Sequence, residues 1–213
     1  MKAVIIPVTQ FQQNCSLIWC DDTGRGAVID PGGDLDRVLA EVERRGVEVE
    51  KILLTHGHVD HAAGTTTLKA TLGCRWKGPT SRSGSGWTAC PTTASSGGFD
   101  EASAFEPDRW LDDGDTVSVG NIVLDVYHCP GHTPGHVVFF EPRTRIAFVG
   151  DVLFKGSIGR TDFPRGDHEQ LLGSIRGRLW PLGDDVTFVP GHGPVSTFGD
   201  ERRTNPFVGE GAR

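Results

Sequence analysis

The chain has 213 residues, with 21 Lys and Arg against 28 Asp and Glu, which gives a formal net charge of −7. At about 150 residues per domain, this length predicts a single domain over residues 1–213. The 29 glycines and 13 prolines are typical of a loop-rich globular protein, and a charged fraction of 23% is too ordinary for a disordered chain. The acidic balance disfavours nucleic acid and anionic membranes as partners, and the oligomeric state stays open.

No feature near the amino terminus predicts export. No apolar run approaches the roughly 18–20 residues of a membrane span. Pro7 and the polar residues after it interrupt the first apolar run too early for a secretory signal. The five cysteines are an odd number at irregular spacing. Without an export signal, we expect free thiols in a reducing cytoplasm.

The first half of the chain begins with strands. Runs rich in β-branched and aromatic residues predict strands at 4–6, 16–20 and 26–30, the last two joined by a turn. Apolar residues at helical spacing from Leu35 to Val42 predict a helix, with Asp34 as its N-cap and Gly46 just past its end. A buried strand at 51–55 and a helix at 62–72 follow.

The second half repeats this theme. We predict strands at 116–119, 122–127, 137–140, 146–149 and 186–189, with a helix at 167–179. Strand runs mixed with helices in each half favour two packed sheets with helices outside.

Residues 74–98 do not fit this pattern, because they have neither strand nor helix periodicity. Trp76 and Trp87 and two cysteines would be unusual in a natural flexible linker, which is one interpretation. Our other hypothesis is a displaced reading frame, since a one-base shift can turn residues 74–79 and 84–91 into ordinary globular sequence. The DNA sequence would decide between them. A displaced segment would uncover apolar surface at about 25 cal/mol per Å², so a frame-restored chain should melt at a higher temperature.

A dense group of polar residues follows the strand at 51–55. His56, His58, Asp60 and His61 fall within six positions. Alternate residues of an extended segment project to the same side, so His56 and His58 can face one ion. Asp60 and His61 lie where the chain turns into a helix and can face a second ion. Neutral imidazole and carboxylate are ligands that Zn²⁺, Mn²⁺ and Fe²⁺ accept.

Further candidate ligands stand directly after other predicted strands. His132 follows the strand at 122–127, Asp151 follows 146–149, and His192 follows 186–189, each in a loop rich in Gly or Pro. Loops at one edge of a rigid sheet are where ligands converge. We therefore expect a metal site at this edge.

These residues resemble the signature of the metallo-β-lactamase superfamily, His-x-His-x-Asp-His followed by an isolated His, an Asp and a His, and within it the glyoxalase II-like hydrolases. The resemblance implies a four-layered αββα sandwich of the α+β class. It further implies a first ion on His56, His58 and His132, a second on Asp60, His61 and His192, and Asp151 as the bridge. It runs from the first strand to Asn205-Pro206-Phe207 apart from 74–98, and is nearest the short bacterial proteins that lack a C-terminal helical domain.

The ligand set points to hydrolysis. Two ions about 3.5–4 Å apart can share a water and lower its pKa toward about 7. The resulting bridging hydroxide would attack a thioester, with S-D-lactoylglutathione, giving D-lactate and glutathione, as the first substrate to test. Asp60 is expected both to bind metal and to orient the hydroxide as a catalytic residue. We expect two divalent ions per chain, zinc first, with iron and manganese as alternatives.

Other residues are candidates for substrate binding or support. Arg160 lies where longer glyoxalase II enzymes carry a basic residue for glutathione, so it can bind a substrate carboxylate; an ion pair with Asp162 or Asp167 is the alternative. Lys155 and Arg165 are further candidates. Among the remaining histidines, we expect His136 to have a structural or supporting role and His168 to be solvated, and we assign no role to His128. Cys15 and Cys129 are expected to be buried.

Rival functions remain open. The stretch Gly159–Phe163 resembles one in persulfide dioxygenases, which use one iron and oxygen on glutathione persulfide. Lactonase and β-lactamase activities belong to the same fold. A folded but inactive or damaged metal-binding protein is a reading of another class. The number of metal ions per chain separates the binuclear hydrolase from the iron dioxygenase.

Overall fold

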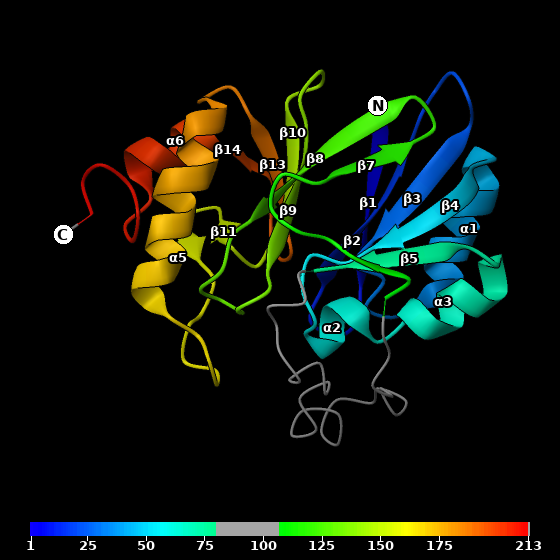
Figure 1. The fold of residues 1–213 in the computed structure, drawn as a ribbon, viewed down its shortest axis with the longest axis horizontal. Coiled ribbons are helices and arrows are strands. Elements are labelled where there is room, and N and C mark those ends of the chain that lie inside the picture. Colours follow the sequence, from blue (N-terminus) through cyan, green and yellow to red (C-terminus); the bar gives the residue numbers. More distant parts are fainter. Residues whose placement is uncertain (80–106, 213) are drawn as a thin grey trace.

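Two six-stranded sheets pack face to face, and helices cover both outer faces (Figure 1). The structure is a computed structural model that describes residues 1–79 and 107–212. This is the expected four-layered αββα sandwich. None of the helices in those ranges is long and apolar enough to cross a lipid bilayer.

The first sheet comes from the amino-terminal half. β1, β2 and β3 pair antiparallel, and β3, β4, β5 and β6 pair parallel. Helices α1 and α3 cover its outer face in Figure 1, and the short helix α2 lies at one end of the sandwich. The bounds are β1 Lys2–Val8, β2 Gln13–Trp19, β3 Arg25–Ile29, α1 Leu35–Arg45, β4 Glu48–Leu53, α2 Val59–Ala62, α3 Thr65–Leu72, β5 Arg75–Gly78 and β6 Arg109–Trp110.

The second sheet has the order β14-β13-β10-β9-β8-β7. Only β10 and β13 pair parallel among its described strands. Helices α5 and α6 cover its outer face (Figure 1). The bounds are β7 Thr116–Val119, β8 Ile122–His128, β9 Val137–Glu141, β10 Ile146–Gly150, the hairpin strands β11 Leu153–Phe154 and β12 Ser157–Ile158, α5 His168–Ser174, a π-helix Ile175–Leu179, a 3₁₀ turn Trp180–Leu182, β13 Thr187–Pro190, β14 Ser196–Thr197 and α6 Phe198–Thr204.

Three apolar layers hold the sandwich together. The layer between the sheets includes Leu53, Phe139 and Phe148. Val38 of α1 packs into a second layer on the outer face of the first sheet. Leu171 of α5 packs into a third layer on the second sheet. Each sheet therefore buries both faces, which explains why strands such as β9 are apolar at nearly every position.

Several strands end at the same edge of the sandwich. β3 and β4 run parallel in one sheet, and β8, β10 and β13 share a direction in the other. The loops that follow these five strands carry the polar residues described below. The fold thus brings together side chains that are far apart in the sequence.

Two predicted helix starts need correction. Asp34 precedes α1 with φ 46° but does not cap it with its side chain. Its carboxylate instead accepts the backbone N–H of Thr9 at 2.9 Å. The helix predicted at 62–72 begins earlier, at Val59, and is broken at Gly64. A Cβ on Gly64 would lie 2.5 Å from the carbonyl oxygen of Pro31, so this close approach requires glycine.

Other elements differ from the prediction in extent. Residues 75–78 form β5 between β4 and β6, so this part of the atypical segment is a regular strand. The rest of the segment, residues 80–98, lies outside the described residues. The helix predicted to Leu179 continues past Ser174 as a π-helix. Helix α6 and the short strands β6, β11, β12 and β14 were not predicted.

Candidate metal centre

Three histidines place ring nitrogens close together at the strand-end edge. Nδ1 of His58 lies 3.1 Å from Nε2 of His56 and 2.9 Å from Nε2 of His132. His56 and His58 follow β4, whereas His132 lies in the loop between β8 and β9. Both sheets therefore contribute to this group.

A second group forms where α2 begins. Asp60 and His61 lie in the first turn of this helix, and His192 lies in the loop after β13. Oδ2 of Asp60 lies 3.1 Å from Nε2 of His192 and 3.8 Å from Nε2 of His61. This group also draws on both sheets.

Asp151 lies between the two groups. Its Oδ1 is 3.3 Å from Nε2 of His61, and its Oδ2 is 3.6 Å from Nε2 of His132 and 3.9 Å from Nε2 of His192. The possible ligand atoms lie within 4.8 Å of one another inside each of two partly exposed sets, His56, His58, His132 and Asp151, and Asp60, His61 and His192, and inside a third, fully buried set, Asp30, His56 and His61. One carboxylate thus faces both partly exposed sets.

Two backbone carbonyls fix which ring nitrogen of His132 and of His192 carries a proton. Nδ1 of His132 donates to the carbonyl oxygen of Arg160 at 2.7 Å, and Nδ1 of His192 donates to that of Phe11 at 3.2 Å. A carbonyl oxygen can only accept, so each Nδ1 carries a proton. In the neutral ring, Nε2 then presents a lone pair to the centre.

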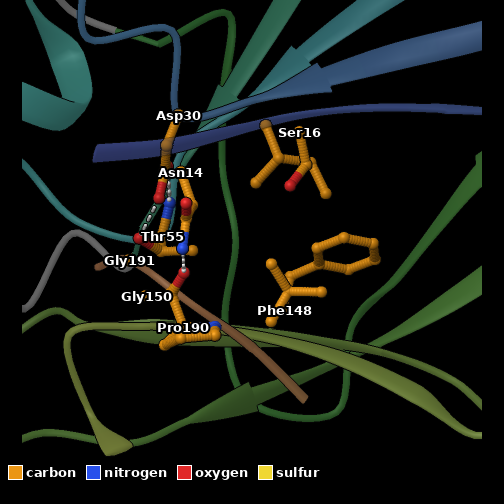
Figure 2. A pocket seen from close by; sticks show the side chains of 10 residues that line it. Asn14, Ser16, Asp30, Thr55, Phe148, Gly150, Pro190 and Gly191 are labelled. Carbon is orange, nitrogen blue, oxygen red and sulfur yellow. Dashed lines mark hydrogen bonds between the residues drawn. The ribbon is translucent and has the colours of Figure 1, made fainter. Parts of the chain in front are cut away.

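The buried carboxylate of Asp30 orders the inner histidines. It accepts Nδ1–H of His61 at 2.9 Å and the N–H and hydroxyl of Thr55 at 2.8 and 2.6 Å. Since the Thr55 hydroxyl donates to Asp30, its oxygen accepts from Nδ1 of His56 at 3.0 Å. Figure 2 shows Asp30 bonded to Thr55 between the sheets. In their neutral rings, His56 and His61 therefore also direct Nε2 lone pairs inward.

This arrangement of donors fits divalent metal ions. Nε2 of His61 and Oδ1 of Asp151 are buried and face each other at 3.3 Å, with no hydrogen bond to any other described residue. A single proton on Nδ1 of His58 can satisfy only one of the two imidazole lone pairs that face it. A cation satisfies all of these groups together. Histidine nitrogen with carboxylate oxygen is a donor set that zinc, iron and manganese accept.

Burial and nearby charges shift the pKa values of the side chains at the centre in opposite directions. Burial lowers the pKa of His58 to about 4, with His132 adding to the shift. Burial also lowers the pKa of His56 well below its usual range. For His61 burial acts the same way, but Asp151 and Asp30 outweigh it and raise the pKa. His61 and His132 in turn hold the pKa of Asp151 low despite its burial. His56 and His58 are therefore neutral at neutral pH.

Close backbone approach is required at Gly191. A Cβ at this position would lie 2.1 Å from Oδ1 of Asp151 and 2.6 Å from Cε1 of His61. The N–H of Gly191 donates to the carbonyl oxygen of Gly150 at 2.8 Å, and Nδ2 of Asn14 donates to that of Pro190 at 3.0 Å (Figure 2). The loop that carries His192 is thus tied to both sheets.

A small cavity lies beside this loop, between the sheets (Figure 2). Its volume of about 10 Å³ gives room for about one water molecule. Ser16 lines it, and its buried hydroxyl has no partner within the part of the chain that the structure describes. Asp30 and Thr55 also line it, so the cavity borders the polar network behind the centre.

Two of the basic candidates, Arg160 and Lys155, lie outside the cluster. The guanidinium of Arg160 forms two contacts of 2.6 Å with Asp162, which was one of the expected alternatives. It lies 4.1 Å from the ring centroid of Phe163, which in turn contacts His58 with 5.1 Å between centroids. Lys155 is exposed in the turn between β11 and β12. Asp167 instead caps α5 by accepting the N–H of Gln170.

The other predicted histidines lie around or away from the centre. His136 is buried and stacks on His56 with 4.6 Å between centroids. Its Nε2 accepts the backbone N–H of Asp151 at 3.1 Å, which agrees with a supporting role. His128 donates to the carbonyl oxygen of Pro134, and His168 is exposed.

Comparison with known proteins agrees with this geometry. The family model described as the metallo-beta-lactamase superfamily matches residues 8–192. The chain belongs to this superfamily. It is 46% identical to a hydroxyacylglutathione hydrolase, GloC, of Haemophilus influenzae over 209 residues, which covers 98% of both chains. A metal-dependent hydrolase of glyoxalase II type is therefore supported.

Two solved structures of the superfamily are similar over nearly their full length. The structure titled BLEG-1 B3 metallo-beta-lactamase has a TM-score of 0.87 and 32% identity, and the match covers 97% of this chain and 99% of that one. TTHA1623 in a di-iron-bound form has a TM-score of 0.80 and 34% identity, with 95% and 99% covered. Both likenesses agree with the sandwich described above.

Proposed function

We propose that this protein is a binuclear metal-dependent thioester hydrolase that converts S-D-lactoylglutathione to D-lactate and glutathione. The observation that carries the proposal is the pair of His/Asp sets that share the neighbourhood of Asp151. The 46% identity to a hydroxyacylglutathione hydrolase supports the choice of substrate. A single catalytic domain and a cytoplasmic location go with it; the described cysteines are all free thiols, which suits a reducing compartment.

Each ion is assigned its own residues. His56, His58 and His132 would hold the first ion, and Asp60, His61 and His192 the second, with Asp151 near both. When bound, the two ions would lower the pKa of a shared water and would place positive charge beside the substrate carbonyl. Zinc is our first choice because its usual ligands are those present, with iron and manganese as alternatives. The di-iron form of TTHA1623 keeps iron in consideration.

Asp60 is assigned a second role. Its Oδ2 lies 3.1 Å from Nε2 of His192. Burial alone would raise the pKa of Asp60, but the contact with His192 and the charge of His61 outweigh burial and lower this pKa. Asp60 is thus a carboxylate at neutral pH, able to accept a proton from the attacking water and orient it. Water adds to the thioester carbon, the C–S bond breaks, and the sulfur leaves as a thiolate that needs little protonation.

Arg160 and Lys155 are proposed to bind the carboxylates of the glutathione part. Arg160 is 60% exposed in its side chain and stacks on Phe163, which contacts His58. The backbone carbonyl of Arg160 accepts a hydrogen bond from His132, so the side chain of Arg160 branches from a point beside the centre. A planar guanidinium suits bidentate recognition of a carboxylate.

An iron persulfide dioxygenase is the second candidate. The stretch 159–163, which resembles those enzymes, lies against the first histidine set. The carbonyl oxygen of Arg160 accepts a hydrogen bond from His132, and the ring of Phe163 contacts that of His58. This function needs one iron per chain and dioxygen as the oxidant of glutathione persulfide. It is therefore separated from the hydrolase by metal stoichiometry and by oxygen uptake. A chain that holds no metal would point to an inactive or damaged protein.

The first experiment measures metal per chain on freshly purified protein by elemental analysis. We expect close to two equivalents of zinc, iron or manganese, and release of thiol from S-D-lactoylglutathione. Nitrocefin, a β-lactam, and glutathione persulfide with an oxygen electrode serve as competing substrates. One equivalent of iron with oxygen uptake, or cleavage of nitrocefin alone, would replace the proposal.

Variants then assign the metal sets. His58→Ala and His61→Ala should each lose metal and most of the thioesterase activity, because each removes a nitrogen from one set. His168→Ala is the matched control, since this histidine is exposed at the start of α5. Full activity of either metal-set variant would contradict the assignment.

A further inference from the structure

Glu201 of α6 is a buried carboxylate at a junction of three segments. It is 2% exposed. Its Oε1 accepts the hydroxyl of Ser196 at 2.6 Å, and its Oε2 accepts the N–H of Gly156 at 2.7 Å and Nδ2 of Asn205 at 2.9 Å. Burial of a polar group is unfavourable unless it is hydrogen-bonded, and three donors bind the two oxygens of this side chain.

One of these segments is the β11–β12 hairpin. It begins directly after Asp151, and Gly156 stands in its turn with φ 71°. The chain leaves the hairpin toward Arg160, whose carbonyl oxygen accepts Nδ1–H of His132. Both ends of the hairpin therefore connect to the candidate metal centre.

Asn205 reinforces the hold on this hairpin. Its Nδ2 donates to the carbonyl oxygen of Ser157 at 3.0 Å and lies 3.4 Å from that of Phe154. Its Oδ1 accepts the N–H of Phe207 at 3.0 Å. Two buried polar side chains, Glu201 in α6 and Asn205 at its C-cap, thus form hydrogen bonds with the backbone of the hairpin.

Ser196 connects the same carboxylate to the other segment. It lies in β14, which ends the loop that carries His192. An apolar side chain at position 201 would be enough to pack α6 against the sheet, as the buried side chain of Phe198 does in the same helix. A hydrogen-bonded carboxylate instead fixes the hairpin and the His192 loop relative to each other.

We propose that Glu201 is a positioning residue that sets the distance between Asp151 and His192, and so the geometry of both candidate metal sets. This inference rests on the proposed function for the role of those residues. Glu201 itself touches neither set among its described contacts. Its effect is expected to appear in metal affinity before it appears in any property of α6.

The test compares Glu201→Ala with Glu201→Gln. The glutamine can keep all three partners, because its oxygen accepts from Gly156 and Asn205 while its NH₂ donates to a rotated Ser196 hydroxyl. Phe198→Leu is the control for stability, since it weakens the packing of α6 without touching the carboxylate. Zinc affinity is measured by competition with a chromophoric chelator, well below the melting temperature of each variant, and hydrogen exchange reports on the amides of 153–158.

Glu201→Ala should weaken zinc binding about 10- to 100-fold and speed exchange in the hairpin. Glu201→Gln should restore most of the affinity, and Phe198→Leu should bind zinc like the wild type. If Glu201→Ala does not fold, Asn205→Ala takes its place with the same expectation. A folded alanine variant that binds zinc like the wild type overturns the inference, as does an equal loss in Phe198→Leu. A wild-type chain that binds no zinc, iron or manganese overturns the proposed function itself, which keeps the two failures apart.

Discussion

Oδ2 of Asp30 lies 2.9 Å from Nδ1 of His61 and holds that ring with its other nitrogen toward the candidate metal centre. The same carboxylate takes two hydrogen bonds from Thr55. Asp30→Ala should therefore weaken metal binding about 10- to 100-fold. It should also reduce the free energy of unfolding by about 1–3 kcal/mol for each buried donor left without a partner. Chelator competition and urea denaturation measure the two effects.

Asp36→Ala provides the control for this prediction. Asp36 is exposed in the first turn of α1, so its loss should change neither quantity by a measurable amount. Wild-type metal affinity in Asp30→Ala would show that His61 keeps its orientation without the carboxylate.

Arg160→Ala should affect substrate binding more than chemistry. If the guanidinium binds a carboxylate of the substrate, KM for S-D-lactoylglutathione should rise about tenfold while kcat stays within about twofold. Asp162→Ala is the matched variant, because it removes the ion-pair partner but leaves the arginine. KM should not rise in Asp162→Ala. An unchanged KM in Arg160→Ala would leave Arg160 as a surface ion pair only.

Two glycines offer a paired test of close packing. Gly191→Ala should abolish metal binding and lower activity by about 10²-fold or more, since the new methyl group meets both Asp151 and His61. Gly173→Ala, in α5, meets no atom within 4 Å and should raise stability by up to about 1 kcal/mol. Thermal melts and thiol-release assays on both variants check the pair. Comparable activity in the two would contradict the close approach at Gly191.

The cysteines should differ in reactivity. Burial raises the pKa of Cys15 and of Cys129 far above the usual thiol range. The thiolate is the reactive form, so neither should react with iodoacetamide at pH 8 while the protein is folded. Hydrogen bonds from Thr23 and from backbone groups lower the pKa of Cys20, so this thiol, although only 4% exposed, should react faster than Cys15 and Cys129. Peptide mapping by mass spectrometry distinguishes the sites, and equal labelling of Cys15 and Cys20 would count against the prediction.

Much of the fold follows from local patterns, and the exceptions have physical causes. Gly46 takes φ 62° at the end of α1, as a glycine at that place predicts. Asp34 looks like a cap in the sequence, yet its side chain serves Thr9, a partner that only the tertiary fold supplies. Helix α6 was missed although Thr197 caps it by accepting the N–H of Asp200, a signal present in the sequence.

At the centre, sequence reasoning found the inward-facing residues more readily than those behind them. The spacing of His56 and His58 predicted convergence, and their nitrogens do meet. Asp30 escaped notice, although it too follows a strand and precedes Pro31 and Gly32. The support given to His132 could not be predicted, because it comes from the carbonyl of Arg160, and a backbone group leaves no trace in residue type.

The two candidate sets draw residues from both sheets, and this has a consequence for the lifetime of the folded chain. An ion held by His58 and His132 would act as a reversible cross-link between halves that otherwise meet through apolar contacts and a few hydrogen bonds, such as that of Asn14 to Pro190. Such a link closes a long loop and so limits the freedom of the open chain, much as a disulfide does. The availability of metal would then set how long each molecule resists proteolysis, as well as whether it turns over the proposed substrate.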